Sequence, residues 1–428
     1  MSTTVKVYKY SMQGIPQLSN AWGVLTDMLD AVLVNGFNLK TITGISRVGS
    51  VATATIGAGM VTEVDQVLLI AGSDQPEYNG EFRVLSSTSN SFTFTVTGSP
   101  VTPATGTMSV KVAPLGWTAP FTGTNKRAYR AATGLRHYLR VDNSLDPANT
   151  TTYAKKGKVT ICESMTDIDT IVGAQAPYSA GNPNLNHVAT GSGITVVDGW
   201  YKWYYARSEA NNADQIAPAA GNRQWTIIGD DRGFYFFTEH NGTYGKAAYA
   251  FTEFESFRQG DAYNTYIAAT DFNYNASQAP SQAYAYGFYN SPEFGNMFAA
   301  NYAQTYGYAG KQILRSHLQV GAPTSTAFVA STAYSGWNTN IPWPNGPDMS
   351  LLLQPPLLIQ EFDGGVRGKL PGLMWVLNNQ PLSDLQVVNN VAGYEGRKFM
   401  IIQLPMSITA TPQGPVCRMA FDITGPWR

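Results

Sequence analysis

Short runs of alternating apolar and polar residues dominate the chain between about residues 41 and 112. Five or six such runs are separated by turn-forming residues, for example Tyr78-Asn79-Gly80 and Gly98-Ser99-Pro100. Within one run, Phe92 and Phe94 fall on one face and the intervening threonines on the other. A period of two is typical of strands, and the turns recur at short spacing. The pattern therefore predicts a small β-sandwich or barrel.

A strand and a helix are expected before this region. Alternation over Val5–Tyr10 predicts a short strand. Further on, Ser19 or Asn20 is placed to cap a helix, and Gly36 is placed to end it in a left-handed conformation. The apolar residues of this helix recur at spacings that put them on one face, for packing against a sheet: Trp22, Leu25, Met28, Leu29, Val32 and Leu33.

After about residue 113 the strands are joined by loops of mixed polar composition. Lys158–Cys162 is a strand candidate, and 164–172 is predicted to be a short helix capped by Ser164. The glycines and aspartates of 229–233 predict the turn of a hairpin within Gln224–His240. Further strand candidates continue almost to the end of the sequence, which predicts that the last residues are held in place.

Together these patterns predict a mainly β fold, α+β with few helices. Its main part is a β-sandwich or barrel-like fold, with a small β-sandwich or barrel domain inserted near the N-terminus. We divide the sequence into 1–40, a strand and helix packed on the main domain; 41–112, the inserted β domain; and 113–428, the main β-rich domain. A further division of the main domain would fall in the proline-stiffened stretch near 320–350.

Composition favours a protein that works by assembly. Charged residues make up 13% of the 428, roughly half the usual share, while the chain holds 41 glycines and 24 tyrosines. Such a surface suits burial against partner chains, including copies of the same chain, because interfaces are depleted in charge and enriched in aromatics. A net charge of −1 offers no basic field for phosphates, so nucleic-acid binding is not expected.

The two cysteines, Cys162 and Cys417, predict buried thiols in a reducing compartment and no disulfide framework. No apolar run approaches the roughly 20 residues that span a bilayer, and the first residues do not resemble a secretion signal. We therefore expect no membrane span, and synthesis in a cytoplasm.

Candidate chemistry is sparse. The four histidines (His137, His187, His240 and His317) lie in no nucleophile or zinc motif. Three carboxylate pairs could in principle cleave a glycosidic bond: Asp230/Asp231, Glu253/Glu255 and Glu361/Asp363. Each lies beside a turn or alternates along a strand, where acidic residues are usually solvated. No ligand spacing for a metal and no phosphate loop occurs, so we predict no cofactor and no enzyme.

Two stretches are candidates for contacts with partners. The segment Pro114–Asn143, hereafter the seam, is a polar loop with aromatic residues that leads into a basic strand at Leu135–Val141. It holds the main concentration of basic residues, for which we prefer ion pairs with a neighbouring subunit over nucleic acid. Aromatic and arginine side chains often anchor interfaces, so we predict an interface within or between subunits at Trp117, Phe121, Lys126, Arg127, Tyr129 and Arg130 in the seam. Contact residues are also predicted in a tyrosine-rich stretch, at Tyr284, Tyr286, Tyr302 and Tyr306, for which the alternative is an irregular surface segment ordered by its neighbours.

The seam also carries a family resemblance. Gly116-Trp117, the run Phe121–Arg130 (FTGTNKRAYR) and the following strand resemble a recurrent passage in virion structural proteins of tailed double-stranded-DNA bacteriophages. Further stretches look like parts of the same family: Trp22-Gly23, Leu33–Phe37, Glu163–Asp167 and Gly396–Phe399. The resemblance is scattered over most of the chain, with 41–112 as the variable insertion, and it carries no catalytic residues.

What the resemblance implies is a structural role in the virion, in the tail, baseplate or fibre adaptor. The protein would form a homo-oligomer and contact other tail or baseplate proteins, among them a fibre or receptor-binding protein. The alternatives are a receptor- or carbohydrate-binding tail protein that uses its tyrosines as stacking platforms, a polysaccharide-degrading enzyme, and a head or neck surface protein.

Overall fold

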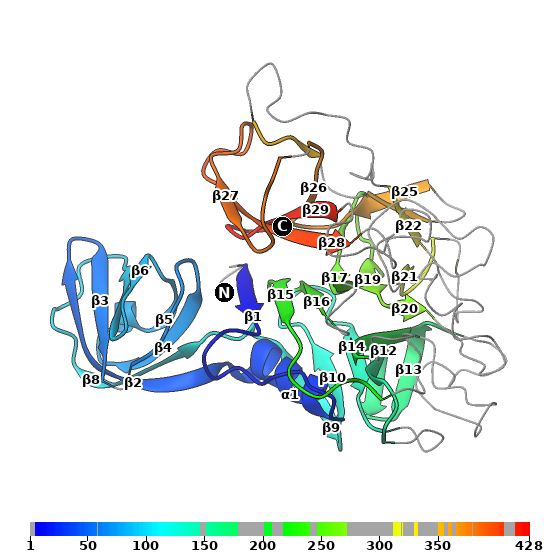
Figure 1. The fold of residues 1–428 in the computed structure, drawn as a ribbon, viewed down its shortest axis with the longest axis horizontal. Coiled ribbons are helices and arrows are strands. Elements are labelled where there is room, and N and C mark those ends of the chain that lie inside the picture. The colour runs from blue at the N-terminus through cyan, green and yellow to red at the C-terminus, as the bar shows by residue number, and fades with distance from the viewer. Residues whose placement is uncertain are drawn as a thin grey trace.

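A computed structural model gives the fold of the protein (Figure 1). It describes residues 5–57, 59–145, 151–178, 201–207, 217–239, 246–271, 311–317, 319, 329–332, 350–354, 358–361, 365–378, 380–405 and 416–428. The described residues form five antiparallel sheets and a short helical segment, which confirms the predicted mainly β fold.

The region of alternating runs forms one seven-stranded sheet, hereafter the small sheet. It curls so that β5 approaches β7, and it stands apart from the other sheets, in blue and cyan in Figure 1. Phe92 and Phe94 are buried on its inner face, as their alternation predicts. Whether residues 41–112 form an independent domain stays a prediction. In sheet order the strands are β5 (Gly80–Arg83), β4 (Val67–Ser73), β8 (Gly106–Val112), β2 (Phe37–Val48), β3 (Val51–Ile56), β7 (Ser91–Thr95) and β6 (Ser86–Ser87), with a 3₁₀ turn, η2 (Pro76–Tyr78).

The predicted helix exists but begins later than Ser19 or Asn20. Helix α1 (Val24–Leu29) follows Gly23, which has φ 89°, and continues as the π-helix η1 (Asp30–Asn35). Asn143 Oδ1 accepts the Leu25 N–H at 3.1 Å, so a residue 118 positions away satisfies a free N–H of the first turn. The cap therefore comes from tertiary structure, which explains why a local Ser or Asn does not set the start.

The seam belongs to a second seven-stranded sheet, hereafter the seam sheet. The predicted helix at 164–172 is wrong: this stretch is the end of β12, a turn and the start of β13. Asp167 Oδ1 accepts the Asp169 N–H, which closes a tight turn, and Met165 pairs with Ile171 across the hairpin. The path is β20 (Thr270–Asp271), β14 (Tyr201–Ala206), β12 (Lys155–Asp167), β11 (Tyr138–Asp142), β10 (Lys126–Arg130) and β9 (Thr118–Gly123), and β13 (Thr170–Ala176) also pairs with β12.

A six-stranded sheet forms the middle layer of the body, by which we mean all described residues outside 37–112. The predicted hairpin at 229–233 is confirmed, because Asp230 Oδ1 accepts the N–H groups of Arg232 and Gly233. The first strand of the chain pairs with β15, as Lys6 faces Gly229. The order is β1 (Lys6–Lys9), β15 (Trp225–Gly229), β16 (Gly233–Thr238), β17 (Ala247–Glu253), β19 (Thr265–Ala268) and β21 (Lys311–Ile313).

Two further sheets come from the C-terminal third of the chain. The five-stranded C-terminal sheet covers the middle layer on the side away from the seam sheet. Its order is β23 (Leu353–Gln354), β26 (Leu373–Val376), β29 (Val416–Asp422), β28 (Lys398–Pro405) and β27 (Val387–Asn389). A four-stranded sheet has the order β18 (Glu255–Ser256), β25 (Gly365–Lys369), β24 (Leu358–Glu361) and β22 (Val329–Thr332).

Alternation along β16 explains the layering of the body. Phe234 lies edge-on to Trp117 and to Trp203 of the seam sheet, at ring distances of 5.6 and 5.8 Å. Its neighbour Tyr235 points the other way and meets Phe421 of the C-terminal sheet at 5.0 Å. Successive side chains of a strand alternate between faces, so one aromatic strand supplies two hydrophobic interfaces. The result is a sandwich-like body.

Candidate interaction site

The seam is a three-strand meander, β9–β10–β11, on the outside of the body. Its first hairpin turns at Thr124-Asn125, where Asn125 has φ 56°, a left-handed conformation that asparagine tolerates well. The seam returns the chain from the small sheet: the N–H of Leu115 donates to Val32 O, and that of Trp117 donates to Leu33 O. These two hydrogen bonds fix the start of the seam against η1.

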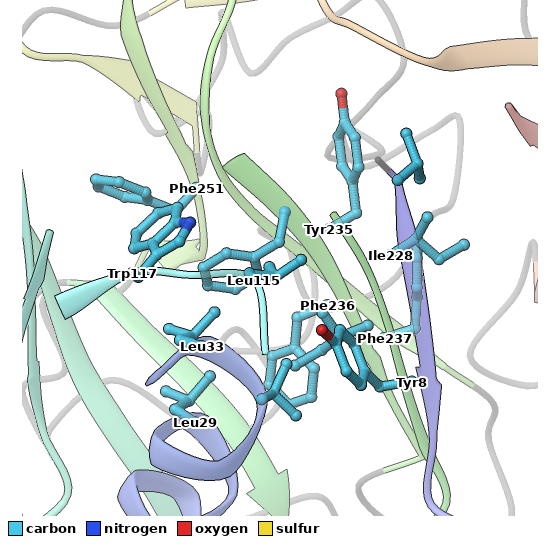
Figure 2. Packing of buried hydrophobic residues seen from close by; sticks show 14 of the residues in the cluster. Tyr8, Leu29, Leu33, Leu115, Trp117, Ile228, Tyr235, Phe236, Phe237 and Phe251 are labelled. Atoms are coloured by element: carbon cyan, nitrogen blue, oxygen red, sulfur yellow. The ribbon is translucent and has the colours of Figure 1, made fainter. Parts of the chain in front are cut away.

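Trp117 is an internal anchor. Its side chain is only 2% exposed, and its Nε1 donates to Asp230 O at 3.3 Å. Figure 2 shows the indole beside Phe251, with Leu29 and Leu33 of the helical segment below Leu115. Burying a side chain of this size stabilises a fold by several kcal/mol, roughly in proportion to the apolar area removed from water. Trp117 thus joins the seam to the middle sheet within one chain.

Tyr129 and Arg127 join the seam to the helical segment. The Tyr129 hydroxyl donates to Asp30 Oδ1 at 2.8 Å, and Arg127 Nε donates to Asp30 Oδ2 at 2.9 Å. Burial, together with the negative charge of Asp30, raises the pKa of Tyr129 well above its usual value. The tyrosine is therefore a neutral donor at any physiological pH. Asp30 receives one donor on each oxygen, so this contact is complete inside the chain.

The remaining predicted seam residues are half-buried and lie together near the open face of the sheet. Lys126 Nζ donates to Asp169 at 2.8 Å. The Arg130 guanidinium carbon lies 4.9 Å from the Tyr138 ring centre, and the Phe121 ring packs against the same tyrosine at 5.7 Å. Each has an intramolecular partner and keeps part of its surface accessible. Whether any of the six contacts a partner chain stays a prediction.

Several sequence candidates fall outside the described residues. These are Tyr284, Tyr286, Tyr302 and Tyr306 of the tyrosine-rich stretch, together with His187, His240 and Asp363. The side chain of Cys417 also lies outside the described part. The thiol of Cys162 is buried, and this burial raises its pKa to about 12.

The carboxylates considered for glycosidic chemistry hold the chain together where they are described. Asp230 Oδ2 accepts Arg428, Asp231 Oδ2 accepts the Thr133 hydroxyl, and Glu253 Oε1 accepts the Leu135 N–H at 2.5 Å. Burial raises the pKa of Glu253, with the hydrogen bonds and nearby arginines acting against the rise. These carboxylates accept hydrogen bonds from donors elsewhere in the chain, which is the pattern of structural carboxylates.

A polar cluster that sequence reasoning missed lies where three sheets meet. A bulge in β12 directs Glu163 out of the ladder, toward Gly173 and Ala174 of β13. Glu163 accepts the Tyr263 hydroxyl at 3.0 Å and Arg315 at 3.4 Å. Burial works to raise the pKa of Glu163, but these donors and the Ala174 N–H lower it below the usual value.

His137 completes this side of the cluster. Its ring stacks on Tyr263 with centres 6.0 Å apart, and Nδ1 lies 2.7 Å from the Thr265 hydroxyl. Burial lowers the pKa of His137 to about 4, against the opposing charge of Glu163. The imidazole is therefore neutral near pH 7.

The same cluster extends through Arg367 to the four-stranded sheet. Arg367 binds Asp261 with two nitrogens, at 2.7 and 2.8 Å, and Glu361 with a third contact at 2.6 Å. It also donates to the Arg315 carbonyl at 2.6 Å. His137 and Arg367, the outermost members in sequence, are 230 positions apart, so no local pattern indicated that these residues form a cluster. The cluster joins three sheets through hydrogen bonds and ion pairs.

Exposed apolar side chains concentrate on the small sheet. Eleven large hydrophobic residues are exposed in the described part of the chain, and seven of them lie between 37 and 112. Val48, at 88%, is the last residue of β2, and Val101, at 68%, lies in the connection between β7 and β8. Arg47 braces the β2–β3 turn and this connection, because its Nε donates to Pro100 O and its NH1 to Gly49 O. Sequence reasoning did not identify these valines.

Within the described ranges, no group of three or more histidine, cysteine or acidic side chains is arranged to hold a metal ion. Nor does any helix there have the length and apolarity needed to cross a membrane. No protein-family model matches the sequence, and a search of curated proteins finds no significant match.

Proposed function

We propose that this protein is a structural component of a tailed bacteriophage virion that acts through assembly, in the tail, the baseplate or a fibre adaptor. It is made in the cytoplasm of the host bacterium and then incorporated into the particle. The observation that supports the proposal is the concentration of exposed aliphatic residues on the small sheet, on a chain poor in charge. Monomeric proteins rarely gather exposed apolar surface without a partner for it.

In this role the body supplies a rigid platform and the small sheet makes the contacts. The aromatic layers and the Glu163 and Arg367 cluster bind the body's sheets to one another. The braced segments at Val48 and Val101 present apolar side chains with little freedom to lose on binding. The partners are copies of the same chain and other tail or baseplate proteins.

Solution mass tests the assembly part of the proposal. Sedimentation of the full-length protein at micromolar concentrations should show an oligomer. Val48→Asp with Val101→Asp should shift it toward monomer, because a charge placed in an apolar contact is desolvated at high cost. Val387→Asp, at an exposed valine of the body (42%), is the control and should leave the mass unchanged. A wild-type monomer at all concentrations would contradict the proposal.

Location in the particle is tested separately. Gold-labelled antibodies against the protein should decorate the tails of phage particles that encode it. Label on heads or necks alone would instead favour the head or neck alternative. For the receptor-binding alternative, the described residues offer Phe257 as their exposed aromatic side chain, a poor base for carbohydrate stacking. Binding of the isolated protein on a glycan array would favour that alternative.

A further inference from the structure

The small sheet is joined to the body by two chain crossings that lie side by side. The chain enters at Gly36-Phe37 and leaves at Val112, and Phe37 and Val112 are register partners. Gly36 has φ 70° and ψ 177°, and a Cβ there would lie 2.4 Å from Val112 O. Only glycine allows the two crossings to approach so closely. Two adjacent crossings with no third covalent connection are the geometry of a hinge.

The first strand holds the body side of this hinge. Tyr8 Oη donates to Ala113 O at 2.7 Å, and Lys6 Nζ donates to Pro114 O, just beyond the exit crossing. Lys6 also pairs with Glu81 of β5 at 2.6 Å and is only 4% exposed. The contacts of Tyr8 and Lys6 with residues 113 and 114 fix the pivot, and the Lys6–Glu81 pair is a first ion pair between β1 and the small sheet.

Two further ion pairs connect the small sheet to different parts of the body. Lys9 of β1 pairs with Glu63, and Lys398 of β28 pairs with both oxygens of Asp65 at 2.7 and 2.9 Å. All the lysines are on the body and all the carboxylates on the small sheet. Between them, Arg83 bridges Asp65 O and Val5 O at 3.1 Å each.

The carboxylates are held in a defined turn. The Gln66 N–H donates to Glu63 O, and the Asp65 N–H donates to Val84 O. Asp65 has φ 69°, a left-handed conformation that aspartate adopts more readily than most residues. The acidic side of the contact is therefore preformed, whereas the basic side consists of flexible lysines.

We propose that the small sheet is a movable module that turns about the Gly36/Val112 crossings and is held in the observed orientation by the Lys9–Glu63 and Lys398–Asp65 ion pairs. Relative motion is expected across thin interfaces between parts of a chain, and ion pairs at partly exposed sites weaken with salt. An assembling partner that binds the exposed valines can then reorient the module by breaking these two ion pairs together with the neighbouring contacts of Lys6 with Glu81, Arg83 with Val5 O, and Gln13 with the Val61 N–H, with no need to unfold either part.

Energy transfer between two dyes on the full-length chain tests this. Dyes are attached at Ser99→Cys on the small sheet and Ser383→Cys on the body, with Cys417→Ala; the buried Cys162 thiol is expected not to react. Raising NaCl from about 50 mM to about 1 M should broaden and shift the distribution of dye–dye distances. The Debye length falls to about 3 Å at the higher salt, which weakens the two ion pairs. Lys9→Glu with Lys398→Glu should give a shift in the same direction already at low salt, and raising the salt should then reverse part of it, because salt screens the new repulsion between the carboxylates.

Two controls keep the test decisive. Lys40→Glu makes the same charge change on β2, where no described ion pair involves Lys40, and should leave the distribution as in the wild type. Lys9→Glu with Glu63→Lys reverses one pair and should restore the wild-type distribution relative to Lys9→Glu alone. The proposal is overturned if the wild-type distribution is the same at both salt concentrations and in the Lys9→Glu, Lys398→Glu variant. It is also overturned if Lys9→Glu with Glu63→Lys behaves like Lys9→Glu alone while circular dichroism reports a folded chain.

Discussion

Arg428 reaches back 198 positions to Asp230, with its NH1 2.5 Å from Oδ2 of the carboxylate at the β15–β16 turn. Its NH2 donates to Thr252 Oγ1 at 2.7 Å and to Glu253 O at 2.6 Å. The Arg428 side chain therefore joins the β15–β16 turn to the end of β17 in the middle sheet. This agrees with the expectation that the final residues are held in place.

Replacing Arg428 with Ala is expected to destabilise the protein by about 2–4 kcal/mol, because Asp230 would stay buried without its cationic partner. Urea unfolding followed by tryptophan fluorescence measures the change. Arg258→Ala removes the same side chain from an exposed position and should cost less than about 0.5 kcal/mol. Equal losses in the two variants would show that the ion pair is not responsible.

Trp117→Ala should cost about 3–5 kcal/mol, since it removes a buried ring that packs on Phe234 and Phe251. Trp117→Phe should retain part of this stability and lose the hydrogen bond to Asp230. Phe257→Ala, at a position 59% exposed, is the control and should be nearly neutral. If Trp117→Ala unfolded no earlier in urea than the control, the seam would not be anchored through this residue.

His137 predicts a pH dependence of stability. Its pKa is about 4 in the fold and about 6.5 in the unfolded chain, so its contribution is fully present above pH 6.5 and is lost as the pH falls toward 4. Between pH 7.5 and pH 5 the wild type should lose about 2 kcal/mol through this group.

A His137→Gln variant should lack that part of the loss, as measured by urea unfolding at the two pH values. His317→Gln is the matched control, because His317 contributes its backbone N–H to Glu361. If His137→Gln and the wild type lost equal stability between the two pH values, the imidazole would not be held neutral by the fold.

Arg367→Ala should destabilise by about 3–5 kcal/mol, because Asp261 and Glu361 would both lose their cation in a buried site. Arg367→Lys should recover less than half of the loss, since an ammonium cannot reproduce the two-nitrogen contact with Asp261. Thermal unfolding of both variants measures this. A lysine variant as stable as the wild type would mean that charge alone matters at this junction.

Local patterns predicted what depends on neighbours in sequence. The turn at Asp230 needs its own carboxylate and a following glycine, and the run containing Phe92 and Phe94 needs only alternation. Both were identified correctly. The stretch 164–172 was misassigned because a capping serine and a nearby aspartate also suit a tight turn between strands. The pairing of β12 with β13 makes this stretch a hairpin and not a helix.

The parts of the site that escaped prediction depend on distant residues. Glu163 acquires its role from Tyr263 and Arg315, 100 and 152 positions away. The helix start depends on Asn143 in the same way. Trp117 and Tyr129 were predicted as contact residues from the chemistry of their side chains. Their burial inside the chain follows from packing between distant segments, which a sequence pattern does not encode.

The adjacent crossings at Gly36 and Val112 have a consequence for how this protein can change over generations. Because the chain leaves and re-enters the body at almost the same point, residues 37–112 can be exchanged for another sequence whose ends lie equally close, without altering the path of the rest. The body would then act as a constant frame for different inserted sequences, and the set of partners would change when residues 37–112 are replaced.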